Sequence, residues 1–244
     1  MRDTEMLERL VADLELPVSV LPRYRSNARH LVLRLAPCGD EAKLTVPTGT
    51  PARRIRDFLE DRRDWLLDRS AAAPQAVPFE DGAVVPVEGT DRRIVHDGRH
   101  VGAASFGPCS ITVGGDRRHI NRRVRDTLIN LGRQRLSAQA RLVAERVERP
   151  VAAVSVRDTR SRWGSCSPSG RLSFSWRLIL APQDVLTYVV VHEVAHLVHL
   201  DHSQRFWSLV DDLMPSYRAP KAWLKANGRA LHRYGKQRSG PNLL

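Results

Sequence analysis

Residues 192–202 read His192-Glu193-Val194-Ala195-His196-Leu197-Val198-His199-Leu200-Asp201-His202. On a helix, His192 and His196 lie one turn apart, so both imidazole rings leave the same face and can bind one metal ion. The carboxylate of Glu193 can reach a water molecule at that ion and act as a general base. Three protein ligands would leave the fourth position on zinc open for this water, unlike a closed structural site. The stretch therefore predicts a hydrolytic zinc site on a helix, with one ion per chain.

The third protein ligand has several candidates in the residues that follow. His199 lies seven residues after His192, and seven helical residues rise about 10 Å, too far for one ion with bonds of about 2 Å. His202 can reach the ion if the helix ends near Leu200 and the chain turns back. No glutamate follows the motif, so the carboxylate alternatives are aspartates. We favour His202 and keep as alternatives Asp201, Asp211, Asp212 and His199.

The residues before the motif predict a buried helix. Pro182 and Asp184 suit its first turn, because proline has a fixed φ and a negative charge is favourable at the positive end of a helix. The body of the helix is apolar, with Val185, Leu186, Val189, Val190, Val194 and Leu197. Polar groups on a buried helix need partners, and zinc would supply one for the histidines.

The overall composition is that of a soluble globular protein. The chain has 244 residues, of which 42% are hydrophobic and 27% charged. Its start has no apolar signal region, and no apolar run approaches transmembrane length. The cysteines are few, odd in number and widely spaced (Cys38, Cys109 and Cys166), which fits a reducing compartment. We expect a cytoplasmic protein without a membrane partner. A thiolate binds zinc well, so one cysteine, nearest in sequence Cys166, could inhibit the site.

The net charge of +12 raises the question of a nucleic-acid partner. Only four of the basic residues are lysines, and the arginines are spread along the chain, many beside acidic residues, as in residues 53–69. A GC-rich coding sequence and a solvated surface explain this pattern without selection for binding. Nucleic acid therefore stays a secondary expectation beside a peptide or protein substrate.

The N-terminal part is predicted to contain strands and a helix over residues 1–75. Residues 30–35 alternate in hydrophobicity and residues 43–46 are typical of a partner strand. Thr50 and Pro51 favour a helix start, after which apolar residues recur at helical spacing: Ile55, Phe58, Leu59, Leu66 and Leu67, with Trp65 beside them. A linker-like stretch then leads to a β-rich segment, 76–115.

The C-terminal part, 116–236, is predicted to be the catalytic core. A long helix covers about 118–147, and a short strand follows near Val154. A turn at 168–170 then joins the segment 162–167 to a strand with two faces, Leu172, Phe174, Trp176 and Leu178 on one and Ser173, Ser175 and Arg177 on the other. This hairpin directly precedes the zinc helix, and its edge could hold an extended peptide. The whole pattern predicts an α+β fold with a loose tail, 237–244.

Some residues near the motif are candidates for substrate contact. In the hairpin these are Trp163, Gly164 and Ser165, for which core packing is the alternative. After His202, a further helix contains Phe206, Trp207, Val210 and Leu213 and ends near Pro215. Tyr217 in the following loop could stabilise an oxyanion beside zinc, with ordinary packing again as the alternative.

Several blocks of the sequence resemble the YgjP-like metallopeptidase family in order and spacing: Arg162-Trp163-Gly164-Ser165-Cys166-Ser167, Ser175-Trp176-Arg177-Leu178, Tyr188 to Leu197, His202-Ser203 and Phe206-Trp207. The resemblance implies a zincin-like metallopeptidase core, zinc as cofactor and a soluble protein. By the family's pattern His192, His196 and His202 would be the ligands and Glu193 the catalytic base. The histidine spacing also resembles metzincins, which have a glycine in place of His199, and WLM and SprT-like proteases, which act on protein bound to DNA.

The sequence thus predicts a zinc-dependent metallopeptidase in which Glu193 takes a proton from the attacking water. The alternatives are a zinc hydrolase for another amide and a nucleic-acid-associated protein with structural zinc. The intact Glu193 favours catalysis, because a closed structural site needs no base.

Overall fold

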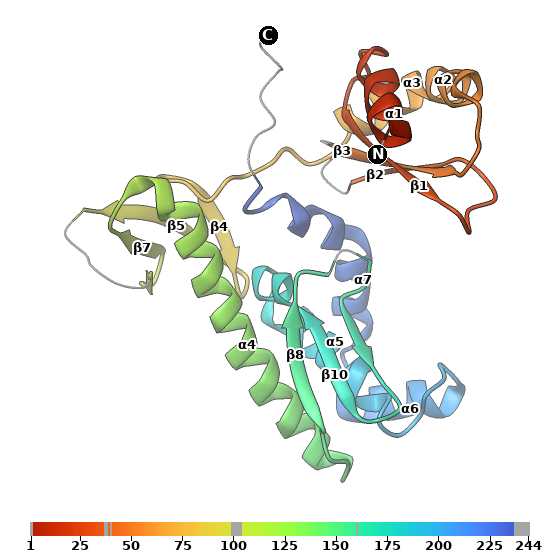
Figure 1. Cartoon of the computed structure of the whole chain (residues 1–244). Helices are drawn as coiled ribbons and strands as arrows, with labels where there is room; N and C mark the ends of the chain where they lie inside the picture. Colours follow the sequence, from red (N-terminus) through yellow and green to blue (C-terminus); the bar gives the residue numbers. More distant parts are fainter. Residues whose placement is uncertain (1, 37–38, 40, 99–103, 160, 237–244) are drawn as a thin grey trace. The chain divides into compact units, whose positions relative to one another are not determined.

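The computed structural model describes residues 2–36, 39, 41–98, 104–159 and 161–236, and Figure 1 shows the order of their elements. The chain divides into two compact units between Ala76 and Val77. Each unit combines helices with small sheets, which confirms the predicted α+β class. The predicted tail, 237–244, lies outside the described residues. Within the described part, no helix is both long and apolar enough to cross a membrane.

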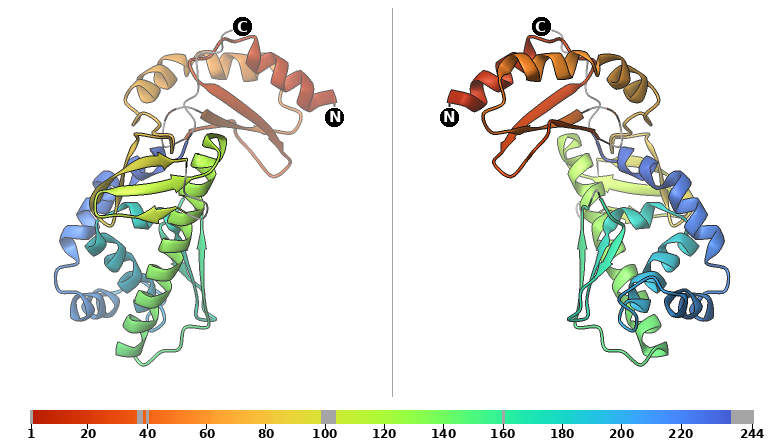
Figure 2. Two further views of the ribbon diagram at one scale, coloured as in Figure 1. Left: turned by 90° about the vertical axis from the view of Figure 1, so that its left-hand side faces the viewer. Right: turned by 90° about the vertical axis from the view of Figure 1, so that its right-hand side faces the viewer.

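The first unit is a three-stranded sheet with helices on one face. The strands lie in the order β1 (Ser19–Arg25), β3 (Glu41–Pro47) and β2 (Val32–Leu35), with β1 parallel and β2 antiparallel to β3. The helices α1 (Arg2–Ala12), α2 (Ala52–Glu60) and α3 (Arg63–Ala71) lie on the same side of this sheet (Figure 2). Alternate strand residues point toward the helices and form one core: Val20, Ala42, Leu44 and Val46 with Leu7, Leu10, Ile55, Leu59 and Leu66.

Two predictions for this unit were wrong in detail. The apolar positions assigned to one helical pattern divide between α2 and α3, because Arg62 leaves the helical conformation at φ −108° and ψ 6°. As a result Leu67 is 47% exposed and does not contribute to the core. Thr50 does not cap the helix: its hydroxyl donates a hydrogen bond to the carbonyl of Pro47 at 2.8 Å and closes the turn after β3.

The second unit begins with the predicted short strands. They form a four-stranded sheet in the order β4 (Val84–Val87), β5 (Thr90–Asp97), β7 (Ser110–Gly114) and β6 (Ser105–Phe106). β5 and β7 are parallel, while the two outer strands are antiparallel to their neighbours. Buried aliphatic residues on these strands join the main core of the unit, among them Val85, Ile94, Ile111 and Val113.

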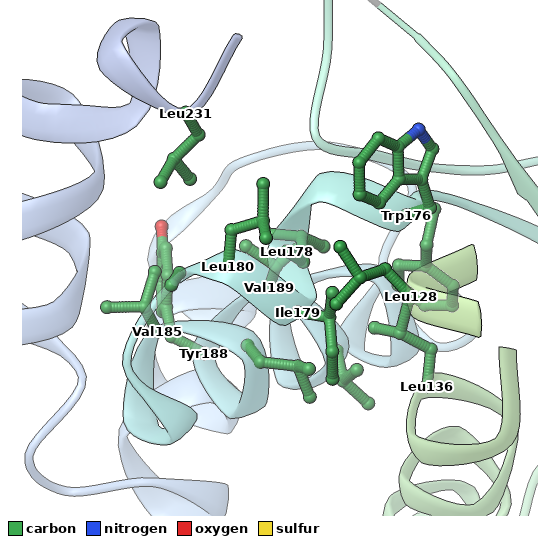
Figure 3. Packing of buried hydrophobic residues seen from close by; sticks show 14 of the residues in the cluster. Leu128, Leu136, Trp176, Leu178, Ile179, Leu180, Val185, Tyr188, Val189 and Leu231 are labelled. Atoms are coloured by element: carbon green, nitrogen blue, oxygen red, sulfur yellow. The ribbon is translucent and has the colours of Figure 1, made fainter. Parts of the chain in front are cut away.

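A long helix, α4, covers Ile120–Arg146, close to the predicted range of 118–147. Gly132 allows it to approach the 3-10 helix Trp176–Leu180, since a Cβ at Gly132 would lie only 3.3 Å from the carbonyl oxygen of Trp176. Leu128 and Leu136 lie one turn on either side of Gly132 and point toward Ile179 (Figure 3). Burial of each such side chain stabilises the fold by about 1.5–3 kcal/mol.

A second small sheet lies next in the chain. Its strands are β8 (Ala153–Arg157), β10 (Arg171–Ser175) and β9 (Gly164–Cys166), with β10 between the other two. β9 and β10 are antiparallel, which confirms the predicted hairpin, and β9 forms one edge of the sheet. The helix α5 (Gln183–Ala195) follows the 3-10 helix, and α6 (Gln204–Leu213) and α7 (Arg218–Asn227) complete the unit.

The prediction that Arg177 lies in the strand, on one face with Ser173 and Ser175, was wrong. The strand ends at Ser175, and the 3-10 helix turns Arg177 inward, where it is 5% exposed. Its guanidinium donates to both carboxylate oxygens of Asp158 at 2.8 and 3.3 Å, and to the carbonyls of Leu231 and Tyr234 at 3.2 and 2.9 Å. Burial acts to raise the pKa of Asp158, but the hydrogen bonds and charge of Arg177 outweigh it and lower this pKa. Arg177 therefore connects the end of β10 to Asp158 and to residues 231–234, which are distant in sequence.

Candidate metal centre

The helix α5 carries the first two histidines at its C-terminal end. Its apolar residues, including Val189, Val190 and Val194, are buried in the core of the second unit. His192 lies in the last turn, and His196 occupies the position that ends the helix. The burial of the helix thus fixes both imidazole rings one turn apart, and their centroids are 5.0 Å apart.

The chain turns back after α5, so that His202 lies next to His192 and His196. The Nε2 atoms of His192 and His202 are 3.1 Å apart, and one nitrogen from each of His192, His196 and His202 lies within 4.8 Å of the other two. Nitrogens bound to one tetrahedral zinc ion at 2.0–2.1 Å would lie about 3.3 Å apart. The three histidines could therefore hold one metal ion with small adjustments of their rings.

The backbone at His199 orients one of these histidines. The carbonyl of His199 lies 2.9 Å from Nδ1 of His196. If Nδ1 carries the proton and donates to this oxygen, Nε2 keeps its lone pair for a metal, an arrangement typical of metal-binding histidines. His199 thus contributes to the site through its backbone, and its side chain is not part of the three-histidine group.

The aspartates weighed as a third ligand lie outside the group of described side chains that could share an ion. The carboxylate of Asp201 accepts a hydrogen bond from the backbone N–H of Ser203 at 3.1 Å, at the start of α6. Asp211 lies 3.5 Å from the guanidinium of Arg218. The backbone carbonyl of Asp212 accepts a hydrogen bond from Arg146.

The surroundings of His192 keep its imidazole neutral. Burial, together with the nearby His196, His202 and Lys221, lowers the pKa of His192 to about 4. Its Nδ1 atom is buried and has no hydrogen-bond partner among the described residues. A neutral imidazole whose Nε2 faces two other histidines is the form that a metal ion requires.

Glu193 is 6% exposed, and its side chain packs against the backbone of a glycine, Gly164. Burial raises the pKa of its carboxyl to about 7, although the charge of Arg162 acts in the opposite direction. A Cβ at Gly164 of β9 would lie 2.5 Å from both Cγ and Oε1 of Glu193. The glycine is therefore required for the Glu193 side chain to occupy its position between α5 and the edge strand.

Of the other predicted contact residues, Ser165 lies in β9, while Trp163 and Tyr217 contact other aromatic rings. Ser165 pairs with Ser173 in the β9–β10 ladder. Trp163 is half-buried, its ring centroid 5.2 Å from that of His232. Tyr217 is buried, and its ring stacks on two aromatic rings beside His192, those of Tyr188 and Trp207.

Two residues near the site were given no role from the sequence. Tyr188 lies one turn before His192 on α5, a spacing that could have indicated it, and burial together with Glu193 raises its pKa to about 12. Lys221 of α7 lies with its Nζ atom 3.7 Å from the ring centroid of Trp207, whose ring is 5.9 Å from that of His202. No local pattern relates this lysine to the motif, because α7 meets the site only in the folded chain.

Neither described cysteine lies within the three-histidine group. Cys166 is half-buried, and its Sγ lies 3.4 Å from the carbonyl of Ser167. Burial and the nearby Glu193 raise the pKa of its thiol to about 11, which disfavours the thiolate that an inhibitory ligand would need. Cys109 is exposed, and Cys38 lies outside the described residues.

Comparison with known proteins found a family model and solved structures that are similar to this chain. A family model described as a YgjP-like metallopeptidase domain matches residues 29–227. Among solved structures, the metallopeptidase zymogen abylysin of Pyrococcus abyssi is 18% identical, with 43% of this chain and 92% of that chain covered and a TM-score of 0.29. A TM-score of this size does not establish a shared arrangement of elements. No curated protein matches the chain.

Proposed function

The chain belongs to the family of YgjP-like metallopeptidase domains, and from this we propose that it is a zinc-dependent peptidase that hydrolyses peptide bonds in a peptide or protein substrate. The proposal rests on three histidines whose nitrogens can share one ion, together with the buried carboxyl of Glu193, the residue that follows the proposed ligand His192. A structural metal site would have no use for an ionisable carboxyl held in this position.

The proposed ligands are His192, His196 and His202, and the donor set fits zinc. Three imidazole nitrogens with an open fourth position are typical of catalytic zinc sites. Zinc bound there would supply a Lewis acid that activates water and polarises a carbonyl group. The hydrogen bond between His196 and the His199 carbonyl supports the assignment, because it leaves the other ring nitrogen free to bind.

We assign the role of general base to Glu193. With a pKa raised to about 7, its carboxylate can accept a proton from the attacking water near neutral pH and pass it to the leaving amine. The close approach of Gly164 restricts the positions open to the carboxylate. Together these features provide a base of suitable strength in a fixed place.

The free edge of β9 is the proposed binding site for the substrate backbone. Among the described strands β9 pairs only with β10, so its other edge can form backbone hydrogen bonds with an extended peptide. Trp163, Gly164 and Ser165 would then line the bound peptide next to Glu193. For Tyr217 we propose a hydroxyl contact with the oxyanion, which a Tyr217→Phe variant would test by a loss in kcat with little change in KM.

We further propose that 116–236 is a zincin-like catalytic core, because every residue assigned to the site lies in this range, from Trp163 just before β9 to Tyr217 just before α7. Residues 1–75 and 76–115 would then be accessory parts. This division predicts that substitutions on α2 or α3 leave kcat unchanged.

The test is cleavage of a fluorogenic peptide library by the zinc-loaded protein, with zinc-loaded Glu193→Gln as the matched control. We expect cleavage that falls about 10²–10⁴-fold in the variant, the usual contribution of a general base. Equal cleavage by both proteins would overturn the assignment of Glu193. Zinc binding without cleavage of any peptide would instead favour a hydrolase for another amide or a structural zinc protein.

A further inference from the structure

The sheet of the first unit has a second face that faces away from its core. On β1, β2 and β3 the residues that alternate with core positions lie on this face. The exposed ones are Ser19, Leu21, Arg23, Arg25, Val32, Arg34 and Lys43, and Glu41 and Thr45 on β3 are half-exposed. All three helices of the unit contribute to the core on the opposite face. We call this surface the open sheet face.

The strand register brings its cations together. Arg34 lies directly opposite Lys43 in the antiparallel pair β2–β3, and Leu21 lies beside Lys43 on β1. Arg23 follows two residues after Leu21 on the same face. Because neighbouring strands are about 4.8 Å apart and a strand rises about 3.3 Å per residue, the backbones of Arg23, Arg34 and Lys43 lie within roughly 12 Å of one another on one surface.

Glu41 lies on the same face, two residues before Lys43, but no ion pair joins it to these cations among the described residues. The ion pairs and hydrogen bonds of the described chain include none from the side chains of Arg23, Arg25, Arg34 or Lys43. Like charges directly opposite each other destabilise a sheet, so the pair of Arg34 and Lys43 costs stability unless an anion lies over it. This arrangement points to a negatively charged partner.

The charge of the unit is segregated by element. Residues 19–47, which contain the sheet, have five Lys or Arg and two Asp or Glu, a net charge of +3. Residues 1–18 and 48–76, which contain the helices, have eight Lys or Arg and ten Asp or Glu, a net charge of −2. Lys and Arg are equally dense in both sets, so the separation arises because the sheet segment has few carboxylates to balance its cations.

We propose that the open sheet face binds the phosphate backbone of a double-stranded nucleic acid. Three of its four cations are arginines, whose planar guanidinium groups bind phosphate oxygens in pairs. Tyr24 packs with the core, and the described residues of the face include no aromatic ring for base stacking. Contacts with phosphates alone carry no sequence information, so we expect binding that is independent of sequence. A duplex presents more phosphate charge per unit length than a single strand, and the net charge of +12 attracts it at long range.

The test is fluorescence anisotropy of the full chain with labelled DNA duplexes of two unrelated sequences. Four phosphate contacts predict a slope of about −3.6 in log affinity against log salt, so affinity falls roughly 150-fold between about 50 and about 200 mM salt. The triple variant R23Q/R34Q/K43Q should weaken binding at least about tenfold and reduce the slope to about −0.9. The control R54Q/R56Q/R69Q removes the same charge from exposed positions on α2 and α3 and should bind like the wild type.

Three outcomes would overturn the proposal. The wild type could fail to bind duplexes at low salt, or the two triple variants could weaken binding equally, which would show that net charge alone is responsible. Competition by poly-glutamate as strong as that by duplex DNA would assign the face to an acidic protein partner instead. Circular dichroism of both variants checks that they fold, and since all the substituted side chains are exposed, we expect the wild-type spectrum.

Discussion

Gly164 and Glu193 are in such close contact that a Cβ at position 164 would lie 2.5 Å from both Cγ and Oε1 of the glutamate. The two residues come from different elements, the edge strand β9 and the helix α5. The strand backbone therefore forms one wall for the proposed general base.

Replacement of Gly164 by alanine should displace the Glu193 carboxylate. We expect kcat/KM to fall about 100-fold, since a shift of about 1 Å in a reacting group can have that effect, while zinc content stays at the wild-type level. Steady-state kinetics and elemental analysis of the same preparation check both parts. The neighbouring Ser165→Ala is the control and should lose far less activity; wild-type kinetics for Gly164→Ala would contradict the role given to this contact.

Substitution of His202 should affect zinc binding much more than substitution of His199. His202→Ala removes a proposed ligand and should lower zinc affinity strongly, by at least about tenfold, the lower end of what even an outer-shell partner contributes. His199→Ala keeps the backbone carbonyl that faces His196 and should bind zinc like the wild type. Isothermal titration with zinc compares the two, and the reverse order of affinities would rule out the ligand set.

The stability of the metal-free protein should depend on the ionisation of Glu193. Its folded pKa of about 7 lies above the ordinary value of 4.5, so the folded state holds the proton more tightly than the unfolded state. The free energy of unfolding therefore declines as pH rises from about 4.5 to about 7, by roughly 3 kcal/mol from this group.

Metal-free Glu193→Gln isolates this contribution, because glutamine does not titrate. We expect the variant to be more stable than the wild type at pH 8 and the difference to shrink toward pH 5. Urea unfolding of both proteins at the two pH values measures it. A difference that is the same at both values would show that the carboxyl is not buried in the ionised form.

Loss of the Arg177 guanidinium should destabilise the second unit. Arg177→Met leaves two carbonyl groups and the half-exposed Asp158 carboxylate without their partner, and a buried acceptor left without a donor costs about 1–3 kcal/mol. Arg177→Lys should recover only part of this, because an ammonium group cannot reach all four acceptors. Urea unfolding at neutral pH checks both variants, and a change below about 1 kcal/mol for Arg177→Met would contradict the assignment.

Local pattern was sufficient to predict the elements around the site. Pro182 and Asp184, a run of apolar residues and two histidines one turn apart predicted α5, and alternating residues around a turn predicted the β9–β10 hairpin. These signals depend only on helical and strand periodicity, which is present in any short window of sequence.

Long-range contacts could not be predicted in this way. The direction of Arg177 depends on Asp158, Leu231 and Tyr234, which are distant in sequence. The contact between Gly164 and Glu193 likewise requires β9 to lie against α5. The break between α2 and α3 was also missed, because apolar residues on either side of Arg62 keep a spacing close to that of one continuous helix.

The central claim is that three histidines and a buried glutamate form a metal centre, and the zinc content of freshly purified protein tests it most directly. Elemental analysis without added metal should find one zinc ion per chain in the wild type and in Glu193→Gln, and far less in His202→Ala. Absence of zinc from the wild type, with none bound on titration, would contradict the account and make the histidine cluster a feature of packing alone.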